Sequence, residues 1–342
     1  MKKRSLFLIL LACFQVTQAQ YFQTGQDPAS IRWRQINTPN FQVIFPDYFE
    51  PQAQKLALKL EKVYDYGSYS LDYQPRKISV ILHTQTVKSN GLVAWAPRRA
   101  EFYTTPHQSI YPQEWLEQLA LHEFRHVVQV DKLDSLLPGL IKAILGEHGT
   151  ALVFGTHLPW WLIEGDAVVT ETALSHYGRG RLPSFLMEHR AQVVQKGVFS
   201  YDKAYLGSYK DFVPNHYKLG YYLVGNARAQ SGIQLWDDVL THAGKKPVTF
   251  SPLNKVLKKQ TGFNKSGLYR SIFDSLHVAW NEADRRFKPQ PSQKVSPSNR
   301  FYSNYIHNHW LNDSTIVSLK RSFDEIPSFV KISPDGSEEK IV

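Results

Sequence analysis

His122-Glu123-Phe124-Arg125-His126 and, further along the chain, Trp161-Leu162-Ile163-Glu164-Gly165 are the two stretches that decide the fold. In an α-helix, residues four apart lie about 40° apart around the axis and about 6 Å apart along it. Both imidazoles of the first stretch can therefore bind one ion. Glu123 lies about 100° from His122, so its carboxylate can reach a water on that ion without being a ligand, which is the position of a general base.

The residues around the first stretch predict a helix over about 112 to 131. Pro112 suits a first helical position, and Glu114 suits the positive end of the helix. Apolar residues recur at helical spacing at Trp115, Leu116, Leu119, Phe124, Val127 and Val128. The alternative is that the two histidines are ordinary helix residues, because a chain with 13 histidines contains this spacing by chance in roughly a few per cent of cases.

The second stretch supplies a carboxylate inside an apolar helix. Pro159 can open this helix, and its buried face is formed by Trp160, Trp161, Leu162, Ala167 and Val168. A lone buried carboxylate costs several kcal/mol unless it is paired, protonated or bound to a metal, so Glu164 is the expected third ligand. Glu171, two turns later, is either an acceptor for a ligating histidine or a solvated surface residue.

Together the two stretches predict a catalytic zinc site. Other zinc patterns are excluded, because a metzincin needs glycine at Gln129 and histidine at Lys132. A deformylase-like site needs a cysteine ligand, but the chain has one cysteine, Cys13, in its N-terminal apolar segment.

His122-Glu123-x-x-His126 followed by Trp161-Leu162-x-Glu164-Gly165-x-Ala167-x-x-x-Glu171 resembles the gluzincin clan, which includes thermolysin and aminopeptidase N, and in particular the peptidase-MA-like domains. The resemblance covers about residues 40 to 285. It implies zinc ligation by His122, His126 and Glu164, with Glu123 as the base.

Tyr217-Lys218-Leu219-Gly220 resembles the segment of aminopeptidase N relatives that carries an oxyanion-stabilising tyrosine. Tyr217 is the candidate donor and His216 the second choice, while the alternative is that Tyr217 belongs to the packed face of a helix. The amine-anchoring Gly-x-Met-Glu-Asn strand of aminopeptidase N is missing, so aminopeptidase specificity is not implied. We expect an edge strand over Trp95 to Tyr103 that pairs with a peptide, with Glu101 at the surface.

The N-terminus indicates export. Lys2-Lys3-Arg4 precedes an apolar run and a small-residue site ending at Ala19, which is typical of a signal peptide over residues 1–19. We therefore expect the periplasm, the cell envelope or secretion. The alternative is a lipoprotein anchored at Cys13, because Leu10-Leu11-Ala12-Cys13 approximates a lipobox. Cleavage after Ala19 leaves no cysteine and no disulfide.

Charge and hydropathy limit the partners. Removal of the signal peptide leaves 37 basic and 30 acidic residues, and the basic residues are scattered, so we expect no nucleic acid partner. Beyond the N-terminus no run is apolar enough to span a bilayer. The apolar segment Leu136 to Trp161 can dock on a membrane surface, but we expect burial under the active site.

The predicted fold class is α+β: a two-lobed zincin-like metallopeptidase domain over 20–287, with a mixed sheet lobe before a helical lobe. Strands are expected at Phe41 to Phe45 and Lys77 to His83, around a helix near Pro51 to Tyr66. Further helices are expected at about 136–146, 160–176, 184–196, 214–229, 232–243, 250–260 and 265–287. A Pro/Ser-rich linker over 288–299 leads to a β segment over 300–342, which resembles one blade of a TolB-like β-propeller.

These features predict a zinc-dependent metallopeptidase that hydrolyses a peptide or protein substrate, with Zn²⁺ as its cofactor. Two alternatives stay open. One is a non-catalytic binding or assembly protein of the cell envelope with a vestigial zinc domain, and the other is hydrolysis of a non-peptide bond at the same centre.

Overall fold

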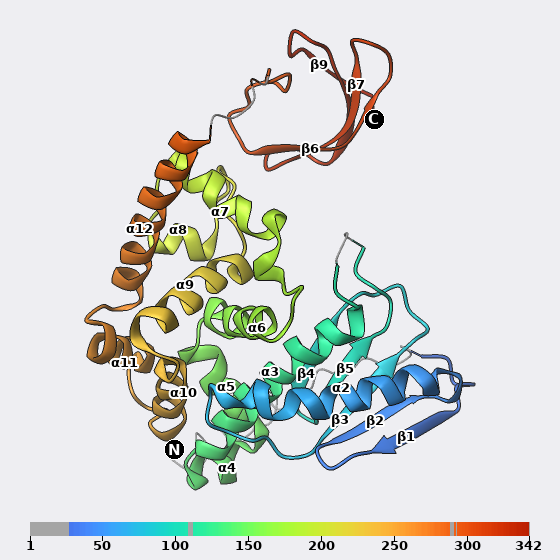
Figure 1. The fold of residues 1–342 in the computed structure, drawn as a ribbon, viewed down its shortest axis with the longest axis vertical. Coiled ribbons are helices and arrows are strands. Elements are labelled where there is room, and N and C mark those ends of the chain that lie inside the picture. Colours follow the sequence, from blue (N-terminus) through green and yellow to red (C-terminus); the bar gives the residue numbers. More distant parts are fainter. Residues whose placement is uncertain (1–26, 109–111, 288–290, 292, 342) are drawn as a thin grey trace, which may run out of the picture. The chain divides into compact units, whose positions relative to one another are not determined.

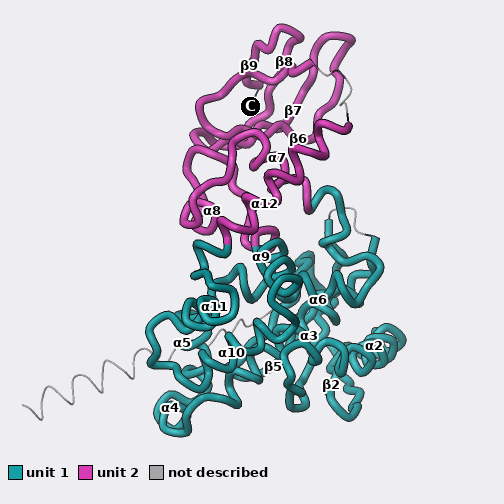
Figure 2. Tube along the Cα trace, turned by 60° about the vertical axis from the view of Figure 1, so that its left-hand side comes forward, with its two compact units in different colours: residues 1–185, 220–268 teal, residues 186–219, 269–342 magenta. Residues whose placement is uncertain are grey.

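The computed structural model describes residues 27–108, 112–287, 291 and 293–341. These residues form two compact units: unit 1 is Met1–Phe185 with Gly220–Leu268, and unit 2 is Leu186–Leu219 with Tyr269–Val342 (Figure 2). The predicted signal peptide and Cys13 lie outside the described residues. The sequence-based division at residues 287 and 299 stays a prediction.

Unit 1 begins with a mixed five-stranded sheet in the order β1-β2-β3-β5-β4. The three central strands β2, β3 and β5 are parallel, and an antiparallel strand flanks them on each side. Buried residues alternate with half-buried ones along β2 and β3, so one face of the sheet is buried. The strands are β1 (Trp33–Asn37), β2 (Phe41–Pro46), β3 (Ile78–His83), β4 (Gly91–Trp95) and β5 (Arg98–Tyr103).

Two long helices, α2 (Glu50–Tyr69) and α3 (Trp115–Leu136), pack against this sheet and against each other (Figure 1). Aromatic rings fill their contact, where Phe41 of β2 meets Tyr64 of α2 and Phe124 of α3 at centroid distances of 5.6 to 6.1 Å. The prediction that Pro112 starts α3 is wrong, because the backbone is still extended at Glu114 and the helix begins at Trp115.

The predicted helical region is confirmed, with small shifts in its boundaries. Two helices, α5 and α8, were not predicted. Glycines at positions 149 and 155 weaken the helical signal of α5, and α8 is very short. The helices after α3 are α4 (Gly139–Leu145), α5 (Glu147–His157), α6 (Trp160–Leu174), α7 (Pro183–Lys196), α8 (Tyr201–Leu206), α9 (His216–Ser231), α10 (Leu235–Lys245), α11 (Pro252–Thr261) and α12 (Lys265–Arg286).

The predicted edge strand over Trp95 to Tyr103 is wrong in its position. Arg98–Tyr103 is β5, which has neighbours on both sides, and the edge strand next to it is β4, Gly91–Trp95. Glu101 is therefore not a surface residue but 2% exposed. Its carboxylate is held by Arg99 at 2.5 Å and faces Nε2 of His83 at 3.3 Å, so the guanidinium compensates for its burial and the imidazole lies against it.

Helices α6 and α9 cross at a pair of glycines within unit 1. A Cβ placed on Gly220 would lie 1.9 Å from the carbonyl oxygen of Trp161 and 2.7 Å from Cα of Gly165. Such distances are far inside van der Waals contact. Glycine at both positions therefore allows the two backbones to touch, and this contact fixes the position of α6, which carries Glu164.

Unit 2 ends in a four-stranded antiparallel sheet with the order β6-β7-β8-β9. The strands are β6 (Ser303–Trp310), β7 (Ile316–Ser322), β8 (Ser328–Ile332) and β9 (Glu338–Lys340). The α+β class with a C-terminal all-β segment is thus confirmed. The assignment of that segment to a propeller blade stays a prediction.

The apolar segment Leu136 to Trp161 is not buried as expected. Leu140, Ile144 and Leu152 are all more than half exposed, although the other face of α5 packs on α3 and α10. Among the described residues, no helix combines the length and the hydropathy that crossing a membrane requires.

The Gly220 contact predicts a specific sensitivity to a single methyl group. We expect Gly220→Ala to lower the free energy of unfolding by about 2 kcal/mol, because either the backbones must separate or the helix must distort. Gly155→Ala is the control, since a Cβ there meets nothing within 4 Å in the interior of α5. Urea unfolding measures the stability of both variants. We expect Gly155→Ala to be as stable as the wild type or more so, and an equally stable Gly220→Ala would contradict the close crossing.

The buried group around His83 predicts a pH dependence. Burial alone would lower the pKa of His83, but Glu101 and Asp27 outweigh it and raise the pKa above 6.5. A raised pKa in the folded state gives a stabilisation that is complete below 6.5 and is lost as the pH rises through the folded-state value. The loss of unfolding free energy in His83→Gln should therefore be larger at about pH 5.5 than at about pH 9. His176→Gln, at an exposed histidine, is the control, and an equal loss at both pH values would contradict the assignment.

Candidate metal centre

Three side chains from two helices of unit 1 converge on one point. His122 and His126 lie one turn apart on α3, and Glu164 comes from α6, which packs against α3. One ligand atom from each lies within 4.8 Å of the others, and all three residues are buried or nearly so. The cluster could hold a metal ion.

The distances in this cluster match a metal site closely. His122 Nε2 lies 3.2 Å from His126 Nε2 and 3.2 Å from Glu164 Oε2, and His126 Nε2 lies 3.3 Å from the same oxygen. In a tetrahedral site with metal–ligand bonds of about 2.05 Å, two ligand atoms are about 3.3 Å apart. The three atoms thus form one face of a tetrahedron of the size that zinc requires.

Polar groups also contact the far side of each ring. His122 Nδ1 lies between an acceptor and a donor, Glu171 Oε2 at 3.0 Å and Arg179 Nη2 at 2.6 Å, so its contacts do not assign one tautomer. His126 Nδ1 lies 2.8 Å from Gln129 Oε1. The amide nitrogen of Gln129 donates to Ile163 O and to Asp166, which makes Oε1 the acceptor. The Nε2 lone pair of His126 therefore points toward the centre when that ring is neutral.

The electrostatics of the cluster favour a cation. Burial alone would lower the pKa of His126, but the carboxylates of Glu164 and Glu123 outweigh it and hold the pKa at about 9. For Glu164, burial would raise the pKa, and the two histidines instead depress it well below its usual range. The buried carboxylates of Glu164 and Glu123 thus favour a protonated, positively charged His126. A divalent ion at the centre can supply this positive charge in place of the proton.

Glu123 is buried beside the cluster without belonging to it. Burial raises the pKa of its carboxyl group, and the nearby His122 and His126 offset only part of that rise. Edge strand β4 covers this carboxylate, because a Cβ on Gly91 would lie 2.6 Å from Glu123 Oε1. A carboxyl with a raised pKa next to an open strand edge is suited to exchange protons with a bound substrate.

Glu171 is fully buried, which rules out the alternative of a solvated surface residue. Burial would raise its pKa, but Arg179 outweighs this and holds the pKa at about 2. The guanidinium donates to Glu171 at 2.7 and 2.8 Å, and its Nη2 also approaches His122 Nδ1 at 2.6 Å. Arg179 lies in a short 3-10 helix after α6, and no sequence pattern marked it.

A second buried network, also missed from the sequence, lies behind the histidines. Arg125, which is 0% exposed, donates to Asp166 at 2.6 and 3.0 Å and to Gly67 O at 2.7 Å. Arg228 reaches the same carboxylate at 2.7 Å, and Gln129 joins it to His126. The sequence did contain a signal for this network: Arg125 and Asp166 each lie in the middle of an apolar helix. Charged residues at such positions are buried only when they have partners.

The oxyanion candidates Tyr217 and His216 lie in the first turn of α9, in the part of that helix that belongs to unit 2. Their rings contact each other at a centroid distance of 4.6 Å. The helix itself is confirmed, and the role of either side chain stays a prediction.

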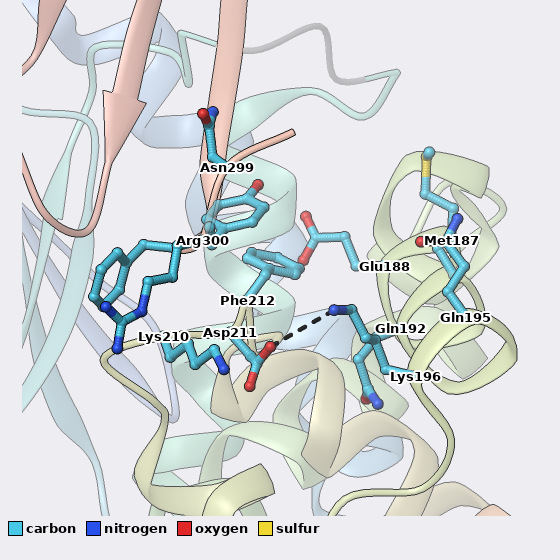
Figure 3. A pocket seen from close by; sticks show the side chains of 13 residues that line it. Met187, Glu188, Gln192, Gln195, Lys196, Lys210, Asp211, Phe212, Asn299 and Arg300 are labelled. Carbon is cyan, nitrogen blue, oxygen red and sulfur yellow. Dashed lines mark ion pairs between the residues drawn. The ribbon is translucent and has the colours of Figure 1, made fainter. Parts of the chain in front are cut away.

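Unit 2 contains a separate cavity of about 320 Å³. It is lined by α7 and by residues 210–212 and 299–302, and Figure 3 shows Lys196 directed toward Asp211, 3.8 Å away. Phe212 and Tyr302 form one wall, with ring centroids 4.8 Å apart. None of the predicted site residues lines it.

Comparisons with known proteins add little to this geometry. No protein-family model matches the sequence, and no curated protein matches it either. Among solved structures, an aminopeptidase N family protein from Idiomarina loihiensis is similar to 92% of this chain and 69% of its own, with 10% sequence identity and a TM-score of 0.45. A similarity at this level carries no conclusion about function.

The triangle of donor atoms predicts the result of removing one. We expect Glu164→Gln to weaken zinc binding by about 100-fold or more, because it replaces the anionic donor with a neutral amide. Equilibrium dialysis against zinc measures the loss, and Glu147→Gln, at an exposed acid of the same unit, is the control. Equal zinc affinity in the wild type and Glu164→Gln would remove Glu164 from the site.

Proposed function

We propose that this chain is a zinc-dependent metallopeptidase that hydrolyses peptide bonds. The observation that carries the proposal is the triangle formed by His122, His126 and Glu164, with sides of 3.2 to 3.3 Å and the buried carboxyl of Glu123 beside it. A bound zinc ion would supply Lewis acidity and a water whose pKa is lowered to about 7.

The chain's own residues would perform the proton transfers. Glu123 accepts the proton of the attacking water and later passes it to the leaving amine, a task that its raised pKa supports. Gln129 keeps Nδ1 of His126 protonated, so that its Nε2 stays a lone-pair donor, and Glu171 lies against Nδ1 of His122 and orients that ring. Tyr217, or His216 in its place, is proposed as the donor to the developing oxyanion.

A peptide is the substrate that the surroundings favour. Strand β4 pairs only with β5 among the described strands, so its other edge offers backbone groups to an extended chain. Gly91 of that strand lies directly against Glu123. A peptide added to this edge would therefore run past the base. We also propose that the peptidase is exported to the cell envelope or secreted, because the N-terminus is predicted to be a signal peptide.

The test is Glu123→Gln, which preserves the size of the side chain and removes its basicity. We expect zinc stoichiometry to stay unchanged while hydrolysis of a degenerate peptide mixture falls by about 10³-fold. Metal analysis and product sequencing measure the two effects on the same sample. Glu117→Gln is the control, because Glu117 lies on the same helix in a surface ion pair with Lys59.

Two outcomes would contradict the proposal. Unchanged turnover in Glu123→Gln would remove Glu123 from the mechanism. Stoichiometric zinc in the wild type without cleavage of any peptide would favour the non-catalytic envelope protein instead.

A further inference from the structure

The loop between α10 and α11 exposes two apolar side chains almost completely. Val248 is 92% exposed and Phe250 is 94% exposed. They alternate with Thr249 and directly follow Lys245, Lys246 and Pro247. Single exposed apolar residues are common on protein surfaces, but a loop that presents a valine and a phenylalanine together beside two lysines is not explained by packing.

Exposed apolar residues also occur on the neighbouring helices. Leu140 and Ile144 of α4 are 73% and 71% exposed, and Leu152 of α5 is 57% exposed. The loop is joined to the end of α5, because His157 Nε2 lies 2.5 Å from Pro247 O. Figures 1 and 2 both show α4, α5 and α10 next to one another, and α4 and α5 are in contact. We call the loop tip formed by Val248 and Phe250 the apolar face.

The sequence that contains the loop carries charge of one sign. Between Asp238 and the end of unit 1 at Leu268 the sequence has no acidic residue. The same stretch contains the lysines at positions 245, 246, 255, 258, 259 and 265. An apolar tip surrounded by lysines complements an anionic bilayer, in which acyl chains lie beneath negatively charged headgroups.

We propose that the apolar face docks unit 1 on the surface of an anionic phospholipid membrane. Val248 and Phe250 enter the interface between headgroups and acyl chains, and Lys245 and Lys246 bind the phosphate groups at the same depth. The chain lies on the membrane without spanning it. This role is independent of the proposed peptidase activity and would hold for an inactive protein.

Vesicle flotation tests the proposal with the full-length chain. We expect the wild type to float with vesicles of phosphatidylethanolamine and about 30% phosphatidylglycerol, and much less with phosphatidylcholine alone. Val248→Ser with Phe250→Ser should reduce partitioning by about tenfold or more, because the inserting area is lost. Lys245→Gln with Lys246→Gln should reduce it by about fivefold for each lysine, on the anionic vesicles only.

Matched controls come from another part of unit 1. Val87 is 93% exposed, so Val87→Ser removes the same side chain from an equally open position, and Lys55→Gln with Lys62→Gln removes two exposed charges from α2. Both should float like the wild type, and circular dichroism should show equal folding in every variant. The proposal is overturned if the wild type does not float, if Val248→Ser with Phe250→Ser floats unchanged, or if the controls lose binding equally.

Discussion

The structure depends on bringing three electron-rich atoms to within 3.3 Å of one another inside the protein. Two imidazole lone pairs and a carboxylate oxygen repel each other unless positive charge lies between them, and burial makes that requirement stronger. Protons can meet it in part, which is why the pKa of His126 is raised to about 9. A divalent ion meets it better, because it binds all three atoms at once. Without a positive charge at the centre, the three donor atoms would repel one another and move apart. Their convergence is therefore the observation that carries the functional proposal.

Holding these atoms together is the task of groups that do not touch the centre. The Arg125–Asp166 ion pair links the helix of the two histidines to the helix of Glu164, and both side chains are almost completely buried. Breaking such a pair by removing one partner typically costs about 3 to 5 kcal/mol, because the other charge is left uncompensated. Asp166 also accepts from Gln129, which binds His126. The same carboxylate therefore contributes both to the packing of α3 on α6 and to the orientation of a candidate ligand. The glycine contact between Gly165 and Gly220 fixes the other side of α6.

Much of this arrangement could be predicted from the sequence, because helical periodicity is a local property. The spacing of His122 and His126 places them on one face of any helix, and Glu164 was identified because an isolated acid in an apolar run needs a partner. The two-turn distance from Glu164 left two interpretations of Glu171 open, and its burial in the structure excludes the surface one. The errors have a common origin in long-range contacts. Glu101 was expected at the surface, whereas the structure buries it against Arg99 and against His83 from a neighbouring strand. The edge strand was misplaced because strand order depends on pairing between distant segments.

The sequence by itself determined the elements and the chemistry of the candidate site: the helices of the two motifs, the residue types of the donor set, and the α+β class. Those features are set by the backbone geometry of single helices and strands and by the cost of burying charge. Only the tertiary structure decided which groups surround the donors, namely Gln129, Asp166 and Arg179, and that β4 covers Glu123. It also decided that the segment from Leu140 to Leu152 stays partly exposed. The hydropathy of a side chain indicates the free-energy cost of exposing it to water. Whether another surface covers that side chain depends on the fold.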